Sequence, residues 1–213
     1  DGSSVFHQLH LLHLKVSAVS TQKLYIIQAS QRAHLIALGH VMNSSDFVSR
    51  QQWGEDGLNS TAQAMMTDLH ALMYGSANLG LEPSSDSNVA SAWHNLNTLV
   101  PIYLEGDPPA TYNTIQSAWD AANFFAGLCN TFVVDSTSSA ESNGKFNYTN
   151  SVAYRGIMDL SVGSLTHSTH NVAMAYDDEG ISKGRSLVYE YAGLTSAFIA
   201  AVLLLEIALL RPS

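Results

Sequence analysis

The apolar run near the end of the chain constrains its fold more than any other feature. Residues 191–210 read YAGLTSAFIAAVLLLEIALL, and Glu206 is their one charged side chain. A helix of about 20 mainly apolar residues is what the hydrocarbon core of a bilayer requires. Arg211 and Pro212 follow the run, a cation and a residue that breaks helices. The segment therefore predicts a membrane-spanning helix.

Two other interpretations fit the same run. A helix buried at the centre of a large bundle is also apolar on every side, and a hydrophobic tail can be a signal that is removed when a lipid anchor is attached. Glu206 counts against a span, because a charge inside lipid is costly. We expect residues 1–190 to form a polar helical-bundle domain. Residues 191–211 are then a candidate transmembrane helix, continuous with the last helix of that domain, or a buried apolar helix.

Helical periodicity dominates the rest of the chain. Between Ser4 and Met42 there is no proline, and apolar residues recur in steps of three and four. No alternation of apolar and polar residues is long enough to predict a strand. The expected fold class is all-α, an elongated up-down helical bundle with an apolar C-terminal helix. Further helices are predicted at residues 61–77, 89–104, 111–132, 149–176 and 182–210, with loops at 43–58 and 134–147 and a turn at Asp177–Gly180.

The charge and the single cysteine exclude some classes of partner and cross-link. The formal net charge is -9, and the nine Lys and Arg residues are scattered along the chain. Neither nucleic acid nor an anionic membrane surface is therefore an expected partner, because each would require a basic patch. Cys129 is the one cysteine, so no disulfide can form within the chain. Its apolar neighbours predict a buried, unreactive thiol.

Three Asn-x-Ser/Thr triplets predict glycosylation. They begin at Asn43, Asn59 and Asn147, each in an expected loop or at a helix start. Chance also produces such triplets in a chain this rich in Asn, Ser and Thr. Together with the apolar C-terminal segment, they favour a cell-membrane location with the bulk of the chain on the extracellular side.

Two groups of histidines are the clearest chemical signal. His7, His10 and His13 recur every three residues, which places them within one third of the circumference of a helix. His167 and His170 repeat the spacing on a later helix. If the two helices lie side by side, four imidazoles can bind one transition metal, with zinc or copper as the expected ion. A pH-responsive cluster and ordinary surface histidines are the alternatives.

The first histidine group also resembles part of a known motif. Residues 6–10, Phe-His-Gln-Leu-His, resemble the start of the H-x-x-H-Cys motif of the fungal UstYa-like oxidative cyclases. That resemblance implies a secreted, copper-dependent oxidation. Leu11 and Asn171 stand where the two motifs of that family carry cysteine.

The sequence holds no G-x-S-x-G nucleophile elbow, and the balance is against an enzyme.

The overall pattern resembles the extracellular helical-bundle sensor domains of membrane receptors. It combines long amphipathic helices, a polar outer domain and a terminal apolar helix. The resemblance implies that the last bundle helix enters the membrane and that a small ligand binds between the helices. The alternative is that the tryptophans fill the core and the arginines form ion pairs. The candidate ligand-binding residues are Gln28, Arg32, Trp93, Trp119 and Arg155.

Three functions are consistent with these patterns. The first is a ligand-sensing extracellular domain of a membrane-anchored protein that signals by helix displacement. The second is a metal-binding protein or metal-dependent oxidative enzyme that uses the two histidine groups. The third is a structural or adhesive surface glycoprotein. The expected partners are the membrane, a small-molecule ligand, and further copies in a homodimer or a larger membrane complex.

Overall fold

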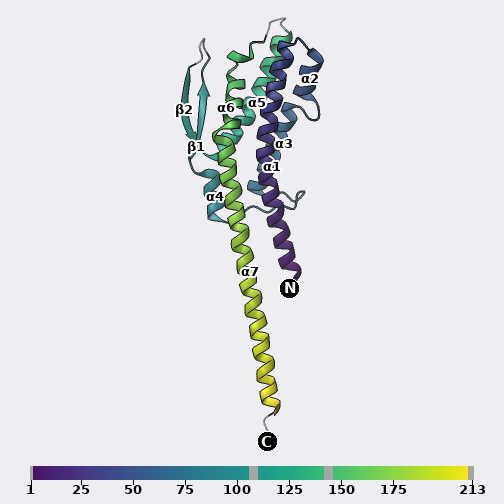
Figure 1. Cartoon of the computed structure of the whole chain (residues 1–213), viewed down its shortest axis with the longest axis vertical. Coiled ribbons are helices and arrows are strands. Elements are labelled where there is room, and N and C mark those ends of the chain that lie inside the picture. The colour runs from purple at the N-terminus through teal and green to yellow at the C-terminus, as the bar shows by residue number, and fades with distance from the viewer. Residues whose placement is uncertain (1, 106–109, 142–145, 211–213) are drawn as a thin grey trace.

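The computed structural model describes residues 2–105, 110–141 and 146–210, and within them the chain is mostly helical with a small two-stranded sheet (Figure 1). The helical class predicted from the sequence is confirmed at this level, whereas the two strands are additional. The elements in chain order are α1 (Gly2–Val41), α2 (Ser45–Trp53), α3 (Leu58–Tyr74), α4 (Ser87–His94), β1 (Thr98–Tyr103), β2 (Thr111–Gln116), α5 (Ala118–Glu141), η1 (Tyr148–Asn150), α6 (Val152–Val162) and α7 (Ser164–Leu210).

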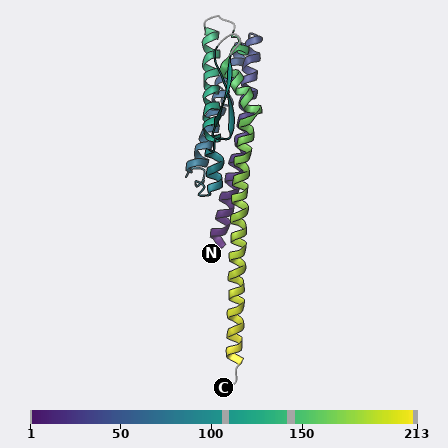
Figure 2. The same cartoon turned by 90° about the vertical axis from the view of Figure 1, so that its left-hand side faces the viewer.

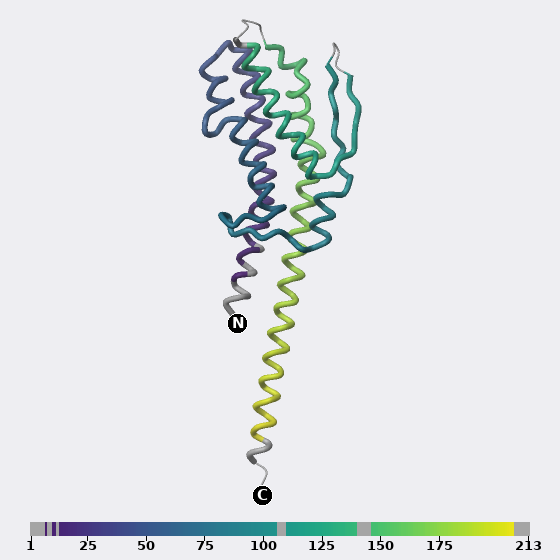
Figure 3. Tube along the Cα trace, turned by 180° about the vertical axis from the view of Figure 1, so that it is seen from behind, coloured from purple at the N-terminus to yellow at the C-terminus, as the bar shows by residue number. Residues whose placement is uncertain are grey.

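The long helices lie lengthwise beside one another in an elongated body (Figures 1 and 2). α1 packs against α2, α3 and α7, and α3 packs against α5. We call α1 to α6, together with residues 164–183 of α7, the helical body. The two ends of the chain lie toward the same end of this body, and α7 continues well beyond α1 (Figure 3).

α1 forms the spine of the helical body because its apolar stripe is long and unbroken. Val19, Ile26 and Ile36 are at most 1% exposed. Ala29 and Ala33 on the same stripe are equally buried, and their small side chains let the neighbouring helices approach closely. Contacts of this kind, rather than intrinsic propensity, supply most of the stability of a helix in a protein.

α5 and α6 pack at close range. A Cβ atom on Gly156 of α6 would lie 2.6 Å from Cδ1 of Leu128 on α5, so any side chain at position 156 would force Leu128 to shift. Cys129 on α5 is completely buried, as expected from its apolar neighbours. Burial raises the pKa of its thiol, which disfavours the reactive thiolate.

β1 and β2 form an antiparallel hairpin where the sequence predicts helices. Leu99 pairs with Ile115, and both strands are rich in Thr, Val, Ile and Tyr, which favour strands. Pro101 would break a helix but is tolerated here. Its nitrogen faces away from β2, because the hydrogen-bonded pairs fall at the alternate positions.

The hairpin lies along the side of the helical body with one open edge (Figure 1). β1 faces α6 and α7, and β2 lies on the outside. Within the residues that the structure describes, β1 is the one strand that pairs with β2. Tyr112 and Ile115 of β2 are 53% and 59% exposed, so this strand with an unpaired edge also carries exposed apolar side chains.

Two expected loops are helical instead. α2 occupies part of the predicted loop at residues 43–58, and α5 extends to Glu141 through the first part of the predicted loop at 134–147. Tertiary contacts explain the difference. The side chain of Gln52 on α2 hydrogen-bonds to Ser136, and both residues are buried. Packing thus overrides the weak helix preference of the serine-rich segment.

The helix predicted at residues 149–176 breaks at Gly163, and the turn predicted at Asp177–Gly180 is not formed. Gly163 leaves the helical conformation with φ -107° and ψ -119°. The helix continues through residues 177–180 because Glu179 is buried and pairs with Lys183 one turn later. α6 and α7 follow each other in the same direction (Figure 1), so the helices do not strictly alternate up and down.

α7 has two halves with opposite environments. It is 47 residues long, which corresponds to about 70 Å. Residues 164–183 pack in the helical body, whereas the side chains of residues 188–206 are all exposed. By length and composition α7 meets the requirement for a membrane-spanning helix, and no part of its most apolar 18-residue stretch is buried.

Candidate functional site

Three segments meet where α7 leaves the helical body. They are the first half of α1, the connection of residues 75–86 between α3 and α4, and α7 around Glu179. The connection turns back on itself at Gly75 and Gly80, whose φ angles of +81° and +63° favour glycine. A Cβ atom on Gly75 would also lie 2.8 Å from the ring of Pro83. The connection is therefore held in a defined path beside α1.

A buried ionic cluster joins these segments. Glu179 is 2% exposed, and its carboxylate accepts hydrogen bonds from Ser84 Oγ at 2.7 Å and from Lys183 Nζ at 2.5 Å. Lys15 of α1 is 5% exposed. Burial lowers the pKa of Lys15, and the nearby Glu179 partly opposes that effect. We call Lys15, Ser84, Glu179 and Lys183 the exit cluster.

A second buried contact lies one turn above the exit cluster. Tyr176 of α7 is 1% exposed. Its hydroxyl accepts a hydrogen bond from Trp93 Nε1 at 3.4 Å and donates one to the carbonyl of Leu72 at 3.2 Å. Burial raises the pKa of this hydroxyl. The contact ties α7 to α3 and α4, so displacement of α7 here would break hydrogen bonds in the core.

The two tryptophans predicted to bind a ligand are brought together. Their ring centroids lie 6.4 Å apart in an edge-to-face arrangement. Trp93 is buried, as expected if it fills the core rather than binding a ligand. Trp119 is partly exposed and also contacts His70 and Tyr74. A row of aromatic rings thus runs from the core at Tyr176 to the surface at Tyr74.

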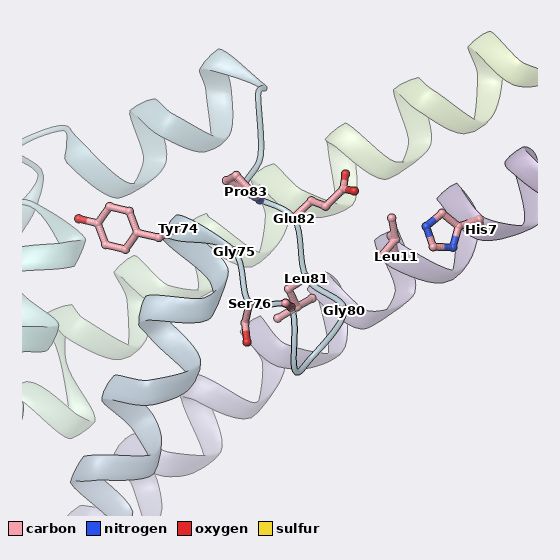
Figure 4. Close-up of a pocket in the computed structure, with 10 residues that line it drawn as sticks. His7, Leu11, Tyr74, Gly75, Ser76, Gly80, Leu81, Glu82 and Pro83 are labelled. Atoms are coloured by element: carbon pink, nitrogen blue, oxygen red, sulfur yellow. The ribbon is translucent and has the colours of Figure 1, made fainter.

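A pocket of about 520 Å³ opens beside the same connection (Figure 4). α1 contributes His7 and Leu11, and the end of α3 with the following connection contributes the rest of the lining. The walls are largely apolar, with His7, Tyr74 and Glu82 as their ionisable groups. Such a mixture suits a small molecule with an apolar body and one polar group.

The other three predicted ligand-binding residues lie elsewhere. Gln28 and Arg32 are one turn apart on α1, and Nε of Arg32 is buried without a hydrogen-bond partner among the described residues. Arg155 on α6 donates from Nε to the carbonyl of Thr149 at 2.6 Å. Among the described residues, no hydrogen bond or ring contact joins these three side chains to the tryptophan pair.

The two histidine groups also remain apart. Because Lys15 lies beside Glu179, His170 is about 14 Å above that level along α7, whereas His13 is about 3 Å below it on α1. Ligands of one zinc ion lie within about 2.3 Å of it. His7, His10, His13, His167 and His170 are all exposed and all described. No group of three or more metal-ligating side chains converges among the described residues, so the shared metal site expected from the sequence is not formed.

The predicted glycosylation positions differ in accessibility. Asn43 is exposed in the turn after α1, with a left-handed φ of 55°. Asn147 is exposed just before η1. Asn59 lies in the first turn of α3 and is half-buried.

The exit cluster shows what sequence patterns can and cannot reveal. Lys15 interrupts the apolar stripe of α1, and Glu179 precedes Lys183 by the four-residue spacing of a helical ion pair, so both signals are present in the sequence. The part played by Ser84 depends on the path of the connection, which no local pattern predicts. Comparison of the chain with family models, curated proteins and solved structures finds no match.

Proposed function

We propose that this chain is the sensing domain of a membrane-anchored protein, with α7 crossing the bilayer and the helical body outside the cell. One observation carries the proposal: a single uninterrupted helix is packed in the body over its first part and exposed throughout residues 188–206 of its apolar second part. Leu194, Phe198 and Leu204 of the second part are 63–70% exposed. A continuous apolar surface of this length is not stable in water, and a bilayer covers it.

The sequons support the assignment of the outer side. Exposed Asn43 follows α1, and exposed Asn147 follows the end of α5. Those helix ends lie at the end of the body opposite to the free half of α7 (Figure 1). Glycans at these positions would point away from the membrane surface.

The pocket and the exit cluster supply a route from ligand to membrane helix. The pocket wall formed by residues 80–83 runs directly into Ser84, which donates its hydrogen bond to Glu179 of α7. A ligand that favours one position of the connection therefore favours one position of Glu179. α1 forms the opposite wall through His7 and Leu11 and reaches the same carboxylate through Lys15. Shifts of about 1–2 Å between packed helices are sufficient for such signals.

Cysteine scanning in proteoliposomes tests the membrane assignment. Cys129 is first replaced by Ala, and single cysteines are then placed at Ile181, Leu194, Phe198 and Val202. A water-soluble maleimide should label position 181 rapidly and the other three at least tenfold more slowly. The same cysteines in detergent-denatured protein supply the control for intrinsic reactivity. Equal labelling at all four positions in the vesicles would contradict a spanning helix.

The same proteoliposomes test sensing. A library of small molecules is screened for compounds that raise the thermal unfolding temperature of the full chain. Ala77 lines the pocket, and Ala90 is exposed on α4 outside it. Ala77→Trp should abolish the shift that a pocket ligand produces, whereas Ala90→Trp should leave it intact. Compounds that act equally on both variants would show that the pocket is not the ligand site.

A further inference from the structure

The packing of α1 against α7 sets the height of the first residues of α1 above the membrane. Lys15 interacts electrostatically with Glu179 and Lys183 of α7, so it lies level with residues 179–183. The two helices run in opposite directions (Figure 3). One residue back along α1 therefore corresponds to one residue forward along α7, at about 1.5 Å per residue. His7 is thus level with about residues 187–191 of α7.

The membrane boundary implied by the proposed function falls at this same level. The apolar run begins at Tyr191, and Tyr189 and Tyr191 are both exposed, as aromatic side chains at a membrane interface are. The headgroup layer is about 5–8 Å thick on each side of the hydrocarbon. His7 therefore lies within the headgroup layer and His10 at its outer limit. His13 stands about 5 Å above that limit, which is within a Debye length of it.

The three histidines face outward from this part of the body. His7, His10 and His13 are exposed, whereas Lys15 on the same helix is buried against α7. Figure 4 shows His7 beside the pocket, at the end remote from Tyr74. We call His7, His10 and His13 the histidine ladder. On α7, Arg185 is exposed at the level of the ladder.

From this juxtaposition we propose that the histidine ladder forms a binding surface for anionic phospholipid headgroups, which is filled when the imidazoles are protonated. The inference rests on the proposed membrane span of α7. Each protonated ring supplies two N–H donors, and phosphate oxygens accept charge-assisted hydrogen bonds.

The charges around the ladder make its protonation decisive. Apart from the histidines, the surrounding cations are Lys15, Lys183 and Arg185, and the carboxylates at the same level are Glu82, Glu179 and Glu190. These six charges cancel, and Asp177 and Asp178 are exposed on α7 just above them. With neutral imidazoles, this end of a chain of net charge -9 has no attraction for an anionic surface. Protonation of the three imidazoles adds three positive charges and reverses the local sign.

Lipid selectivity of the full chain in phosphatidylcholine vesicles tests the proposal. Trace spin-labelled phosphatidylglycerol or spin-labelled phosphatidylcholine reports the fraction of each lipid held at the protein. A charge near an anionic leaflet changes binding about fivefold. We expect the preference for phosphatidylglycerol to be at least threefold greater at about pH 5.5 than at about pH 7.5. An equal preference at the two pH values would overturn the proposal.

Matched histidine variants locate the effect. The triple variant His7→Asn, His10→Asn and His13→Asn should lose the increase at low pH, whereas the double variant His167→Asn and His170→Asn should keep it. Among the single variants, His7→Asn should reduce the increase at low pH most and His13→Asn least, because His7 lies nearest the membrane and His13 farthest from it. The single variants also cover the case in which the triple variant does not fold. A triple variant that folds and keeps the increase would refute the assignment.

Two further experiments separate headgroup binding from phosphate binding, and a failure of this inference from a failure of the proposed membrane span. Inorganic phosphate at about 10 mM should leave the preference unchanged if the surface binds headgroups, and should remove it if the ladder binds free phosphate instead, which would contradict the proposal. Extraction of the vesicles with alkaline carbonate reports whether α7 is inserted. Extraction of the protein would refute the proposed span and, with it, this inference. A retained protein without lipid preference would refute the inference alone.

Discussion

Individual polar side chains inside the helical body differ greatly in how well they are satisfied. Glu179 has two hydrogen-bond donors for its carboxylate. Gln22 of α1 is completely buried, and neither polar atom of its amide has a hydrogen-bond partner within the described residues. A buried group without a partner costs about 1–3 kcal/mol. Some buried polar side chains therefore stabilise the body and others destabilise it. Single substitutions at these side chains should lower the free energy of unfolding in the first case and raise it in the second.

Asp68→Asn should stabilise the protein at neutral pH. Burial raises the pKa of Asp68, although the hydrogen bond from Tyr25 opposes that shift. Because the pKa of Asp68 is higher in the folded state than in the unfolded state, the protein loses stability as the pH rises through the interval between these two pKa values. Asn keeps an acceptor for Tyr25 without the charge. We expect a gain of a few tenths of a kcal/mol at pH 7, kept small because Asp68 is only half-buried.

Urea unfolding at pH 7 and about pH 3 measures this difference. The gain should vanish at the lower pH, where Asp68 is protonated in both states. Asp178→Asn removes the same charge from an exposed position and serves as the control. A gain that persists at low pH would mean that the side-chain amide, and not the lost charge, is responsible.

At the scale of elements, the contact between α5 and α6 depends on one missing side chain. Gly156→Ala should destabilise the protein by about 1–3 kcal/mol, because the new methyl group overlaps Leu128. Gly127→Ala is the matched control, since it adds a methyl group to α5 where nothing lies within 4 Å. That substitution should stabilise the helix by about 0.5–1 kcal/mol. Chemical denaturation of both variants measures the two changes in the free energy of unfolding. Changes in the same direction would contradict this account of the contact.

The elements also show where sequence patterns succeed. α1 is predictable because its stripe repeats at the helical period over its whole length. The apolar half of α7 is predictable by composition alone. The hairpin is not, because residues 98–116 carry apolar side chains whose spacing fits a helix as readily as a strand. Its pairing rests on Leu99 and Ile115 meeting across a turn, together with contacts from β1 to α6 and α7.

The candidate site was predictable only in part for a similar reason. The proximity of Trp93 and Trp119 depends on the packing of α4 against α5. The separation of His13 from His170 depends on the relative height of two antiparallel helices. Neither quantity is encoded in the spacing of residues along one segment.

At the scale of the molecule, the free half of α7 should contribute nothing to the stability of the helical body. Ending the chain after residue 187 removes residues 188–206, whose side chains are all exposed, and the residues that follow them. The free energy of unfolding should change by less than about 0.5 kcal/mol, as for other surface changes. Urea denaturation of both forms in the same mild detergent measures it. Ending the chain before Tyr176 removes core contacts and should cost several kcal/mol, and similar losses for both truncations would contradict a free helix.

The open edge of β2 limits how two copies of the chain can pair. Two such strands joined by a two-fold axis run antiparallel, with the axis perpendicular to both. β2 lies along the length of the body, so that axis is also roughly perpendicular to α7 (Figures 1 and 2). The two α7 helices of the pair then point in opposite directions. Copies anchored side by side in one bilayer cannot adopt this arrangement, whereas copies on two opposed cell surfaces can.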